Sequence, residues 1–298
     1  MTLKKKSAAD IAFIICNGLF MFAFVVVTLY PVLNTVAVSF NDGIDAIRGG
    51  IHLWPRMFTT KNYEEVFSDK DILTGAYISV ARTVLGTVFA LITNALLAYI
   101  VSRKRFLFKS QLSLFWVVTM YVNGGMIPTL LVFQLLKLTG TFWVYVIPGM
   151  VSAFNMLVIR TYMQGLPDSL EESAQLDGAG HMTIFLKIIS PLCKPVYATV
   201  ALFVAVGQWN SWFDCMLYNR TKREYTTLQY ELMQRLSEMQ KTSSGTMTGA
   251  EASQMQAQTT KQTIQAAATV ITMAPIIVLY PFLQKYFVTG LTIGGVKE

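Results

Sequence analysis

Charged residues are scarce in this chain of 298 residues: they make up 14% of it, whereas a soluble domain carries about a quarter. Hydrophobic residues reach 53%, and the mean hydropathy is positive. The few charges are concentrated between long apolar runs, which excludes an ordinary soluble domain and predicts a protein that crosses the membrane several times. The net charge of +7 is typical of basic cytoplasmic flanks and does not indicate a nucleic-acid partner.

Cysteine and histidine are also few. Cys16, Cys193 and Cys215 have no spacing typical of a metal or redox site, and we interpret them as small hydrophobic residues. His52 and His181 have no ligand set near them, so we expect no metal site. The sequence contains no phosphate-binding glycine loop, no HExxH motif and no serine elbow. We therefore expect no enzyme and no cofactor on this chain, and any ATP that it uses must bind to another chain.

Six apolar segments are long enough to span a bilayer. They cover about residues 11–40, 74–102, 111–136, 142–163, 196–217 and 264–287. Basic clusters at Lys4–Lys6 and Arg103–Arg105 flank the first two segments, and the positive-inside rule places both clusters in the cytoplasm. We therefore predict an all-α integral membrane protein, a single domain with six transmembrane helices whose N- and C-termini are both cytoplasmic.

This topology assigns the polar connections to the two sides of the membrane. Residues 41–73 form an external loop with a short helix from Asn62 to Phe67, and residues 164–195 form a cytoplasmic hairpin. Residues 219–262 form a long external loop that is either flexible or a polar helical excursion. Several basic residues in this last loop weigh against its external placement, but long loops contribute little to orientation.

The hairpin 164–195 is predicted to contain two short helices around a glycine elbow. Pro167 and Asp168 are a helix start signal, and Ser169 with Glu172 has the spacing of a capping box. Glycine adopts left-handed conformations at little cost, so Gly178 and Gly180 are expected to end the first helix. Three acidic residues of the hairpin, Glu171, Glu172 and Asp177, are either a solvated helix face or a docking site for a basic partner surface.

Polar residues inside the spans suggest a pathway for a solute. Asn123, next to Gly124-Gly125, and Asn210, between Trp209 and Trp212, lie at similar depths, roughly 20 Å from the cytoplasmic ends of their helices. Aromatic faces and amides suit sugars, because indole stacks on a pyranose ring and amides pair with hydroxyl groups. In a second interpretation, the tryptophans are interface anchors and the asparagines bond neighbouring helices.

Two further features of the spans bear on mechanism. The glycine pair at 124–125 and Pro128 permit a kink or unwound turn, or else they allow close helix packing. Arg82, near an outer end, is expected to extend its charge to the interface. Asp214 is the one acidic residue in the six segments, which disfavours a transporter driven by an ion gradient, since such proteins use intramembrane carboxylates.

The hairpin resembles the EAA loop of ABC importer permeases. The resemblance rests on Glu172-x-Ala174-x-x-Asp177-Gly178-Ala179, followed by Phe185, Ile188, Pro191 and Pro195. Ser173 replaces the usual alanine and Ser190 the usual leucine. The segments GGMIPTLLVF, WVYVIPG, Trp209-Asn210 and YPFLQKYFVTGLTIGGVK resemble carbohydrate-import permeases, in particular the branch that imports oligosaccharides and polysaccharide fragments. The resemblance covers about residue 10 to the C-terminus.

This resemblance implies a transport function without catalysis on this chain. It implies that the hairpin seats in a dimer of ATP-binding subunits, which hold ATP and Mg, and that ATP-driven closure moves the permeases between inward- and outward-facing states. The implied coupling residues are Glu171, Glu172, Ala174, Asp177, Gly178 and Ala179. The resemblance also implies that Glu172 is the docking carboxylate.

The implied partners are a second, different permease, an extracellular solute-binding protein, a sugar and the lipids of a bacterial plasma membrane. Two alternatives stay open: an ion-coupled secondary transporter, and a structural or signalling membrane protein whose hairpin docks a soluble partner.

Overall fold

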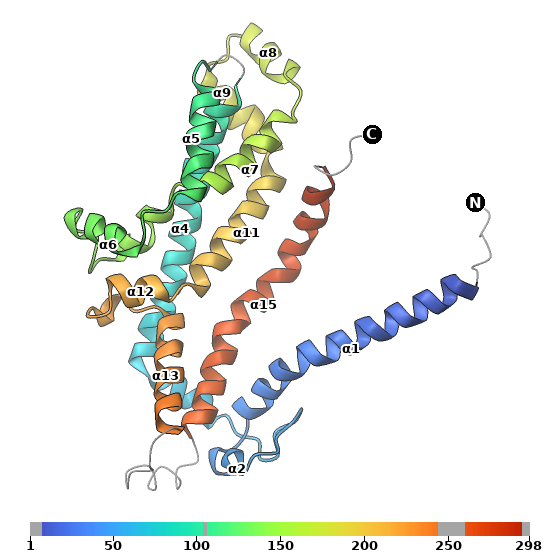
Figure 1. The fold of residues 1–298 in the computed structure, drawn as a ribbon, viewed down its shortest axis with the longest axis vertical. Helices are drawn as coiled ribbons and strands as arrows, with labels where there is room; N and C mark the ends of the chain where they lie inside the picture. Colours follow the sequence, from blue (N-terminus) through green and yellow to red (C-terminus); the bar gives the residue numbers. More distant parts are fainter. Residues whose placement is uncertain (1–7, 104–105, 244–259, 294–298) are drawn as a thin grey trace. The chain divides into compact units, whose positions relative to one another are not determined.

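The structure, a computed structural model, describes residues 8–103, 106–243 and 260–293, and within these ranges its regular structure is helical (Figure 1). The basic residues Lys4–Lys6, Lys104 and Arg105, used above to orient the chain, lie outside these ranges. The elements are α1 (Ala8–Ser39), α2 (Gly43–Ile47), α3 (Lys61–Ser68), α4 (Lys70–Ser102), α5 (Lys109–Tyr121), α6 (Met126–Leu135), η1 (Phe142–Tyr145), η2 (Ile147–Gly149), α7 (Ala153–Gln164), α8 (Ser169–Leu176), α9 (His181–Ile184), the π-helical turn η3 (Phe185–Ile189), α10 (Ser190–Leu192), α11 (Lys194–Asn210), α12 (Phe213–Tyr218), η4 (Arg223–Tyr225), α13 (Leu228–Ser243) and α15 (Lys261–Ile293).

Three helices are long and apolar enough to cross a membrane: Ala9–Ser39 in α1, all of α4, and Lys261–Pro281 in α15. A helix of 33 residues, such as α4, is about 50 Å long, more than the ~30 Å of hydrocarbon that it must cross. Three more apolar stretches are pairs of helices joined at a bend: α5 with α6, η1–η2 with α7, and His181–Leu192 with α11. The described residues therefore contain three to six candidate spans by length and composition.

The stretch predicted as the third span is sharply broken. Helices α5 and α6 meet at 115°, and Gly125 at the break has φ +88. The side chain of Asn123 stabilises the turn by accepting the N–H of Gly125 at 2.9 Å. A Cβ added to Gly124 would meet no atom within 4 Å, so close packing inside this chain does not require the glycine. Of the two interpretations above, the structure has the unwound turn.

The break before α7 is stabilised by a polar residue that we did not single out in the sequence. Asn94 of α4 is fully buried. Its amide nitrogen donates to the carbonyl of Met150 at 2.9 Å, and its amide oxygen accepts the N–H of Ser152 at 3.0 Å. These two backbone groups lie in the non-helical step between η2 and α7, where they lose their helical partners. One side chain thus satisfies both groups at a bend of 43°.

The helix within the predicted span 196–217 is interrupted near its outer end. Helix α11 ends at Asn210, Ser211 is extended with ψ 125, and residues 213–218 form the separate helix α12. Arg82 causes part of this difference, because its guanidinium donates to the carbonyl of Ser211 at 3.3 Å and thereby occupies a backbone acceptor at the break. The apolar stretch bent onto α11, by 79°, is instead His181–Leu192, the second half of the hairpin.

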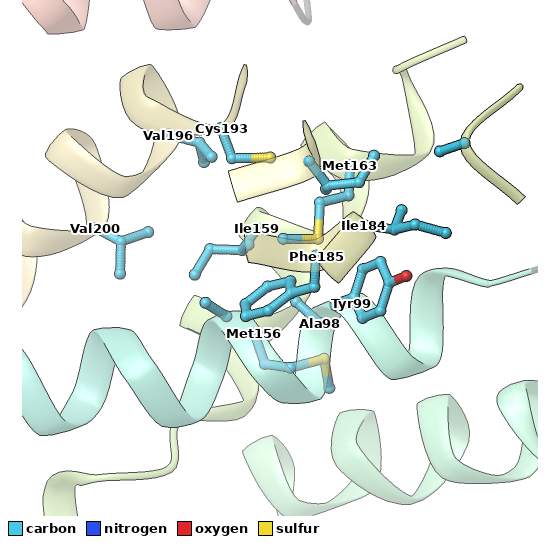
Figure 2. Packing of buried hydrophobic residues seen from close by; sticks show 13 residues of the cluster. Ala98, Tyr99, Met156, Ile159, Met163, Ile184, Phe185, Cys193, Val196 and Val200 are labelled. Atoms are coloured by element: carbon cyan, nitrogen blue, oxygen red, sulfur yellow. The ribbon is translucent and has the colours of Figure 1, made fainter. Parts of the chain in front are cut away.

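The described residues fall into two compact units, one within Met1–Asp69 and Arg235–Met273 and the other within Lys70–Gln234 and Ala274–Glu298. The core of the second unit lies among α4, α7, α11 and the hairpin (Figure 2). Its buried members are Ala95, Ala98, Tyr99, Met156, Ile159, Met163, Ala174, Ile184, Phe185, Ile189, Cys193, Val196 and Val200. The hairpin and the apolar helices thus share one core.

The first unit contains α1 and an ordered segment that follows it. The short helix α3 confirms the one predicted from Asn62 to Phe67, whereas α2 was not predicted. Asn41 and Asn62 are both fully buried. Asn62 donates to the carbonyls of Ser39 and Asn41, and Asn41 donates to the carboxylate of Asp45 at 2.9 Å. The predicted loop 219–262 contains the helix α13, and residues 244–259 lie outside the described part.

Candidate functional site

The glycine elbow of the hairpin is a Schellman motif that ends α8. Gly178 has φ +78, a left-handed conformation that L-residues other than glycine rarely adopt. The N–H of Gly178 donates to the carbonyl of Gln175 at 3.0 Å, and that of Ala179 donates to the carbonyl of Ala174 at 2.9 Å. These are the two bonds of the motif, and Ala174 with Ala179 is its usual apolar pair. The predicted elbow is confirmed, and the two alanines close it.

The predicted start of α8 is one residue too late. Asp168 occupies the N-cap position, and Ser169 is already the first helical residue. The N–H groups of Glu171 and Glu172 both donate to the carbonyl of Asp168, at 3.0 and 3.1 Å. No side chain caps the helix, so the Ser169–Glu172 capping box is not formed. The backbone of Asp168 already has helical dihedral angles (φ −62, ψ −28), and the helix therefore begins one residue before the predicted position.

One face of the hairpin is buried and the other is exposed. Ala174, Ile184, Phe185 and Ile189 belong to the common core, and Phe185 packs against the ring of Tyr99 with centroids 5.0 Å apart. On the other face, the apolar side chains of Leu176, Met182 and Leu186 are 90%, 59% and 58% exposed. The hairpin thus combines side chains that belong to the core with three large apolar side chains that no other part of the described chain covers.

The three acidic residues of the hairpin have different surroundings in the fold. The carboxylate of Glu171 pairs with the guanidinium of Arg103, directly after α4, and both side chains are less than one-fifth exposed. Arg103 also stacks on the ring of Tyr99 at 4.7 Å. Glu172 and Asp177, by contrast, are exposed, and the carboxylate of Glu172 has no hydrogen bond or ion pair within the described residues. Glu171 thus fixes the hairpin to α4, and Glu172 is available to a partner.

The four candidate pathway residues are not equally accessible. Asn123 and Asn210 are exposed and Trp212 is half-buried. Trp209 is buried, with 9% of its surface exposed. The amide of Asn210 donates to the carbonyl of Val206 in its own helix at 3.1 Å. No hydrogen bond joins Asn123 to Asn210 in the described part of the chain. The structure therefore leaves both amides accessible and does not bond them to each other, and it buries Trp209.

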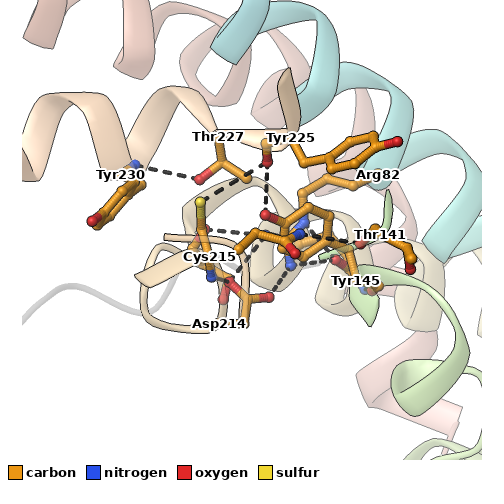
Figure 3. A network of polar contacts seen from close by, with 11 residues as sticks. Arg82, Thr141, Tyr145, Asp214, Cys215, Tyr225, Thr227 and Tyr230 are labelled. Atoms are coloured by element: carbon orange, nitrogen blue, oxygen red, sulfur yellow. Dashed lines mark hydrogen bonds and ion pairs between the residues drawn. The ribbon is translucent and has the colours of Figure 1, made fainter. Parts of the chain in front are cut away.

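Arg82 lies at the centre of a buried polar network (Figure 3). Its guanidinium donates twice to the carboxylate of Asp214 and twice to the amide oxygen of Gln208, at 2.9 and 2.8 Å. It also lies 4.4 Å from the centroid of the Tyr145 ring. Arg82 is only 2% exposed, so the prediction that it extends to the interface is wrong. The half-buried carboxylate of Asp214 and the face of the Tyr145 ring replace water around the guanidinium.

The network joins α4 to η1 and to the region around the break between α11 and α12. Gln208, one residue before Trp209, receives the Arg82 bonds through its oxygen and donates through its nitrogen to the carbonyl of Tyr145 at 3.1 Å. Tyr145 in turn donates to the carbonyl of Tyr225 at 2.7 Å. The break between α11 and α12 is thereby fixed to α4 and η1. A polar Gln208 inside an apolar helix was the signal in the sequence, and we did not pair it with Arg82.

No protein-family model matches this chain. The chain is 36% identical over 287 residues to Protein LplC of Bacillus subtilis (strain 168), an alignment that covers 96% of this chain and 95% of that protein. It is 33% identical over 280 residues to the polygalacturonan/rhamnogalacturonan transport system permease protein YtcP of the same strain, covering 93% of this chain and 96% of that protein.

A solved structure is also similar. It belongs to a bacterial ABC transporter involved in the import of the acidic polysaccharide alginate. The TM-score is 0.87 and the sequence identity 28%, and the match covers 96% of this chain and 100% of that one. The similarity in fold and the similarity in sequence thus extend over nearly the same length.

Proposed function

Because this chain belongs to the permease subunits of carbohydrate ABC importers, we propose that it forms part of the membrane pathway for an oligosaccharide. We also propose that its hairpin binds separate ATPase subunits and transmits their conformational changes to the membrane helices. It is a membrane protein of this importer family, whose members work in the bacterial plasma membrane. We further propose six spans with cytoplasmic termini, a dimer of ATP-binding subunits, a second permease and an extracellular solute-binding protein as partners, and transport by alternating access.

The single observation that carries this proposal is the common core of the hairpin and the helices. Ala174, Ile184 and Phe185 of the hairpin pack with Tyr99 of α4 and Met156 of α7. Protein interiors are close-packed and transmit strain, so a force applied to α8 reaches α4, α7 and α11 without a flexible joint. The pair between Glu171 and Arg103 adds a polar connection at the same place.

The exposed face of the hairpin supports docking to another chain. Leu176, Met182 and Leu186 offer apolar area, and the carboxylate of Glu172 lies on the first turn of α8 with no partner among the described residues. Buried apolar contacts with a charge at their rim are typical of protein interfaces. We propose Glu172 as the docking carboxylate, with Asp177, Gly178 and Ala179 giving the elbow its shape and Ala174 holding it to the core.

The polar network argues against the ion-coupled alternative. Asp214 is the one acidic residue in the six predicted spans, and its carboxylate is occupied by the guanidinium of Arg82. A proton or ion carrier needs a carboxylate that can change its charge, and neutralising Asp214 would leave Arg82 buried without a counter-charge. We therefore assign this pair a structural role.

Reconstitution of the importer complex in proteoliposomes tests the proposal. Sugar uptake is expected to require ATP and to be insensitive to collapse of ion gradients. Glu172→Ala is expected to reduce ATP-driven uptake at least several-fold, or to weaken binding of the ATPase subunits, while the permease still inserts. Glu65→Gln, an exposed carboxylate outside the hairpin, serves as the matched control. Uptake that followed an ion gradient and ignored ATP would refute the function, and unchanged uptake and assembly in Glu172→Ala would remove the residue from docking.

A further inference from the structure

The side chain of Gln208, near the end of α11, is bonded at both ends of its amide. Its oxygen accepts two hydrogen bonds from the guanidinium of Arg82, at 2.9 and 2.8 Å, and its nitrogen donates to the carbonyl of Tyr145 at 3.1 Å. Arginine has no acceptor and a backbone carbonyl has no donor, so the two partners also determine which end of the amide faces which. The amide thus has one orientation, set by α4 on one side and by η1 on the other.

Two glycines leave room for this amide. A Cβ atom added to Gly86 of α4 would lie 2.8 Å from the amide nitrogen of Gln208, 3.0 Å from its Cδ and 3.2 Å from its Cγ. A Cβ atom added to Gly149, the last residue of η2, would lie 3.3 Å from the same nitrogen. Non-bonded carbon atoms pack best at about 3.5–4.0 Å. The amide of Gln208 therefore keeps its observed place because Gly86 has no side chain, and Gly149 leaves it little further space.

The steric restriction at Gly86 depends on the bonds that hold the amide. Arg82 and Gly86 are four residues apart on α4 and lie on the same face of the helix, so one supplies donors to Gln208 and the other supplies space. A free glutamine side chain could turn away from an added methyl group. Here a turn would break the bonds to Arg82, which is 2% exposed, and would leave buried donors unsatisfied. Glycine in a helix interior is less favourable than alanine, and the space that it leaves for Gln208 offsets that cost.

The same guanidinium also holds the chain beyond Gln208. Arg82 donates to the carbonyl of Ser211 at 3.3 Å and to the carboxylate of Asp214 at 3.2 Å. The exposed residue Asn210 lies between these contacts. Its own amide donates to a carbonyl within α11, so its place relative to α4 is set by the contacts at 208, 211 and 214. The orientation of Gln208 and the place of Asn210 are therefore linked.

We propose that Gly86 and Gly149 are positioning residues, which leave a slot for the amide of Gln208 and thereby set the place of Asn210 in the sugar pathway. This inference rests on the proposed pathway role of Asn210. The two glycines act through Gln208 and need no contact with the sugar. A side chain at Gly86 displaces the amide, releases the guanidinium of Arg82 and shifts the end of α11. The effect at Gly149 is smaller, because the contact at 3.3 Å is tight whereas that at 2.8 Å is a clash.

Chemical labelling of position 210 in the intact importer complex tests the slot. Asn210→Cys is introduced together with Cys16→Ser, since Cys16 is the exposed cysteine of the chain, whereas Cys193 and Cys215 are buried and are kept. Two quantities are measured: the rate of reaction with a water-soluble maleimide, and the mobility of a nitroxide attached to the same cysteine. Lys194→Cys, at the exposed first residue of α11, is labelled separately as a reporter of general damage to the helix.

Gly86→Ala is expected to change the labelling rate at position 210 several-fold and to raise the mobility of the nitroxide there, while labelling at position 194 stays constant. Gly207→Ala is the matched control, because Gly207 is next to Gln208 and a Cβ atom there would meet nothing within 4 Å. It should leave both quantities unaltered. Gly149→Ala is expected to give a smaller change than Gly86→Ala, and it tests the slot if Gly86→Ala does not assemble. Equal labelling of position 210 in the parent and in both slot variants would overturn the proposal.

A double substitution separates the slot from ordinary helix packing. Gln208→Ala empties the slot, so adding Gly86→Ala is expected to cause no further change at position 210. A change of the same size with and without the Gln208 side chain would overturn the proposal, because the glycine would then be required for another contact. Labelling does not depend on transport, so a failure of the slot leaves the transport function intact. Conversely, normal sugar uptake in Asn210→Ala would contradict the pathway role of Asn210 without altering the labelling result.

Discussion

Arg82 and Asp214, 132 residues apart in the sequence, form an ion pair in which the guanidinium donates to both carboxylate oxygens, and only 2% of the arginine side chain is exposed. The pair fixes the break between α11 and α12 to the middle of α4. Its energetic worth follows from burial, because removing one partner of a buried pair strands the other charge, whereas removing both does not.

Asp214→Ala is expected to destabilise the complex by about 3–5 kcal/mol, measured as a fall in its thermal midpoint. The double variant Arg82→Met/Asp214→Leu should recover most of that loss, since no charge stays buried. Arg223→Ala is the control, because that side chain is 84% exposed in its ion pair with Asp71 and surface pairs contribute about 0–1 kcal/mol. A double variant as unstable as the single one would contradict the role of charge pairing.

Gly178→Ala should distort the elbow of the hairpin. A residue with a Cβ at φ +78 costs roughly 1–2 kcal/mol, although the added atom would meet nothing within 4 Å. Gly180 is the matched control, because it has φ −73 and equally open surroundings. We expect faster hydrogen exchange in α8 and reduced ATP-driven uptake for Gly178→Ala only. Equal effects of the two substitutions would mean that backbone conformation is not what the elbow requires.

Asn94→Leu should weaken the step between η2 and α7. It leaves the carbonyl of Met150 with fewer donors and the N–H of Ser152 without the amide oxygen, and each buried group left unsatisfied costs about 1–3 kcal/mol. Thr83→Val on the same helix is the control: the Thr83 hydroxyl is buried without a hydrogen bond among the described residues. Thermal unfolding of the purified complex should drop for Asn94→Leu and stay constant or rise for Thr83→Val. The reverse order would be incompatible with this assignment.

Asn210→Ala and Trp209→Ala should distinguish a residue that contacts the sugar from a residue that stabilises the packing of the helices. Asn210 is exposed and its amide donates to a carbonyl in its own helix, so its substitution is expected to lower sugar uptake with little change in stability. Trp209 is buried, and its truncation should cost about 3–5 kcal/mol of stability together with uptake. Uptake assays are compared with thermal midpoints for both variants. Normal uptake in Asn210→Ala would assign this residue to the framework.

The segment that follows α1 should loosen in acid. The hydrogen bond from Asn41, with a further contribution from Arg56, lowers the pKa of the Asp45 carboxyl below its usual 3.8. A carboxyl whose pKa is lower in the folded state contributes stability above its unfolded value, and that contribution is lost as the pH falls through the folded value. Hydrogen exchange of residues 41–58, corrected for its intrinsic rate, should therefore increase below about pH 4. Asp45→Asn should abolish this pH dependence, and a dependence that persisted would exclude Asp45 as its source.

Local chemistry explains why parts of the fold were predictable. The apolar runs, the unwound turn at Gly125 and the elbow at Gly178 depend on a few consecutive residues, because hydrophobic length and left-handed backbone conformation are properties of short segments. The helix end at Asn210 was missed for the opposite reason. It depends on a donor from Arg82 that reaches Ser211 across 129 residues.

By itself the sequence determined that this is a helical membrane protein of the carbohydrate-importer type, with an acidic glycine-elbowed hairpin between apolar helices. The packing of the helices determines which acidic residue of the hairpin forms an ion pair. Arg103 pairs with Glu171 across 68 residues, and Glu172 is left exposed. Only this tertiary packing decided, in addition, that Arg82 is neutralised inside the bundle and that Trp209 is buried. Pairing between distant side chains depends on where helices pack, and neighbouring residues in the sequence contain too little information to specify that packing.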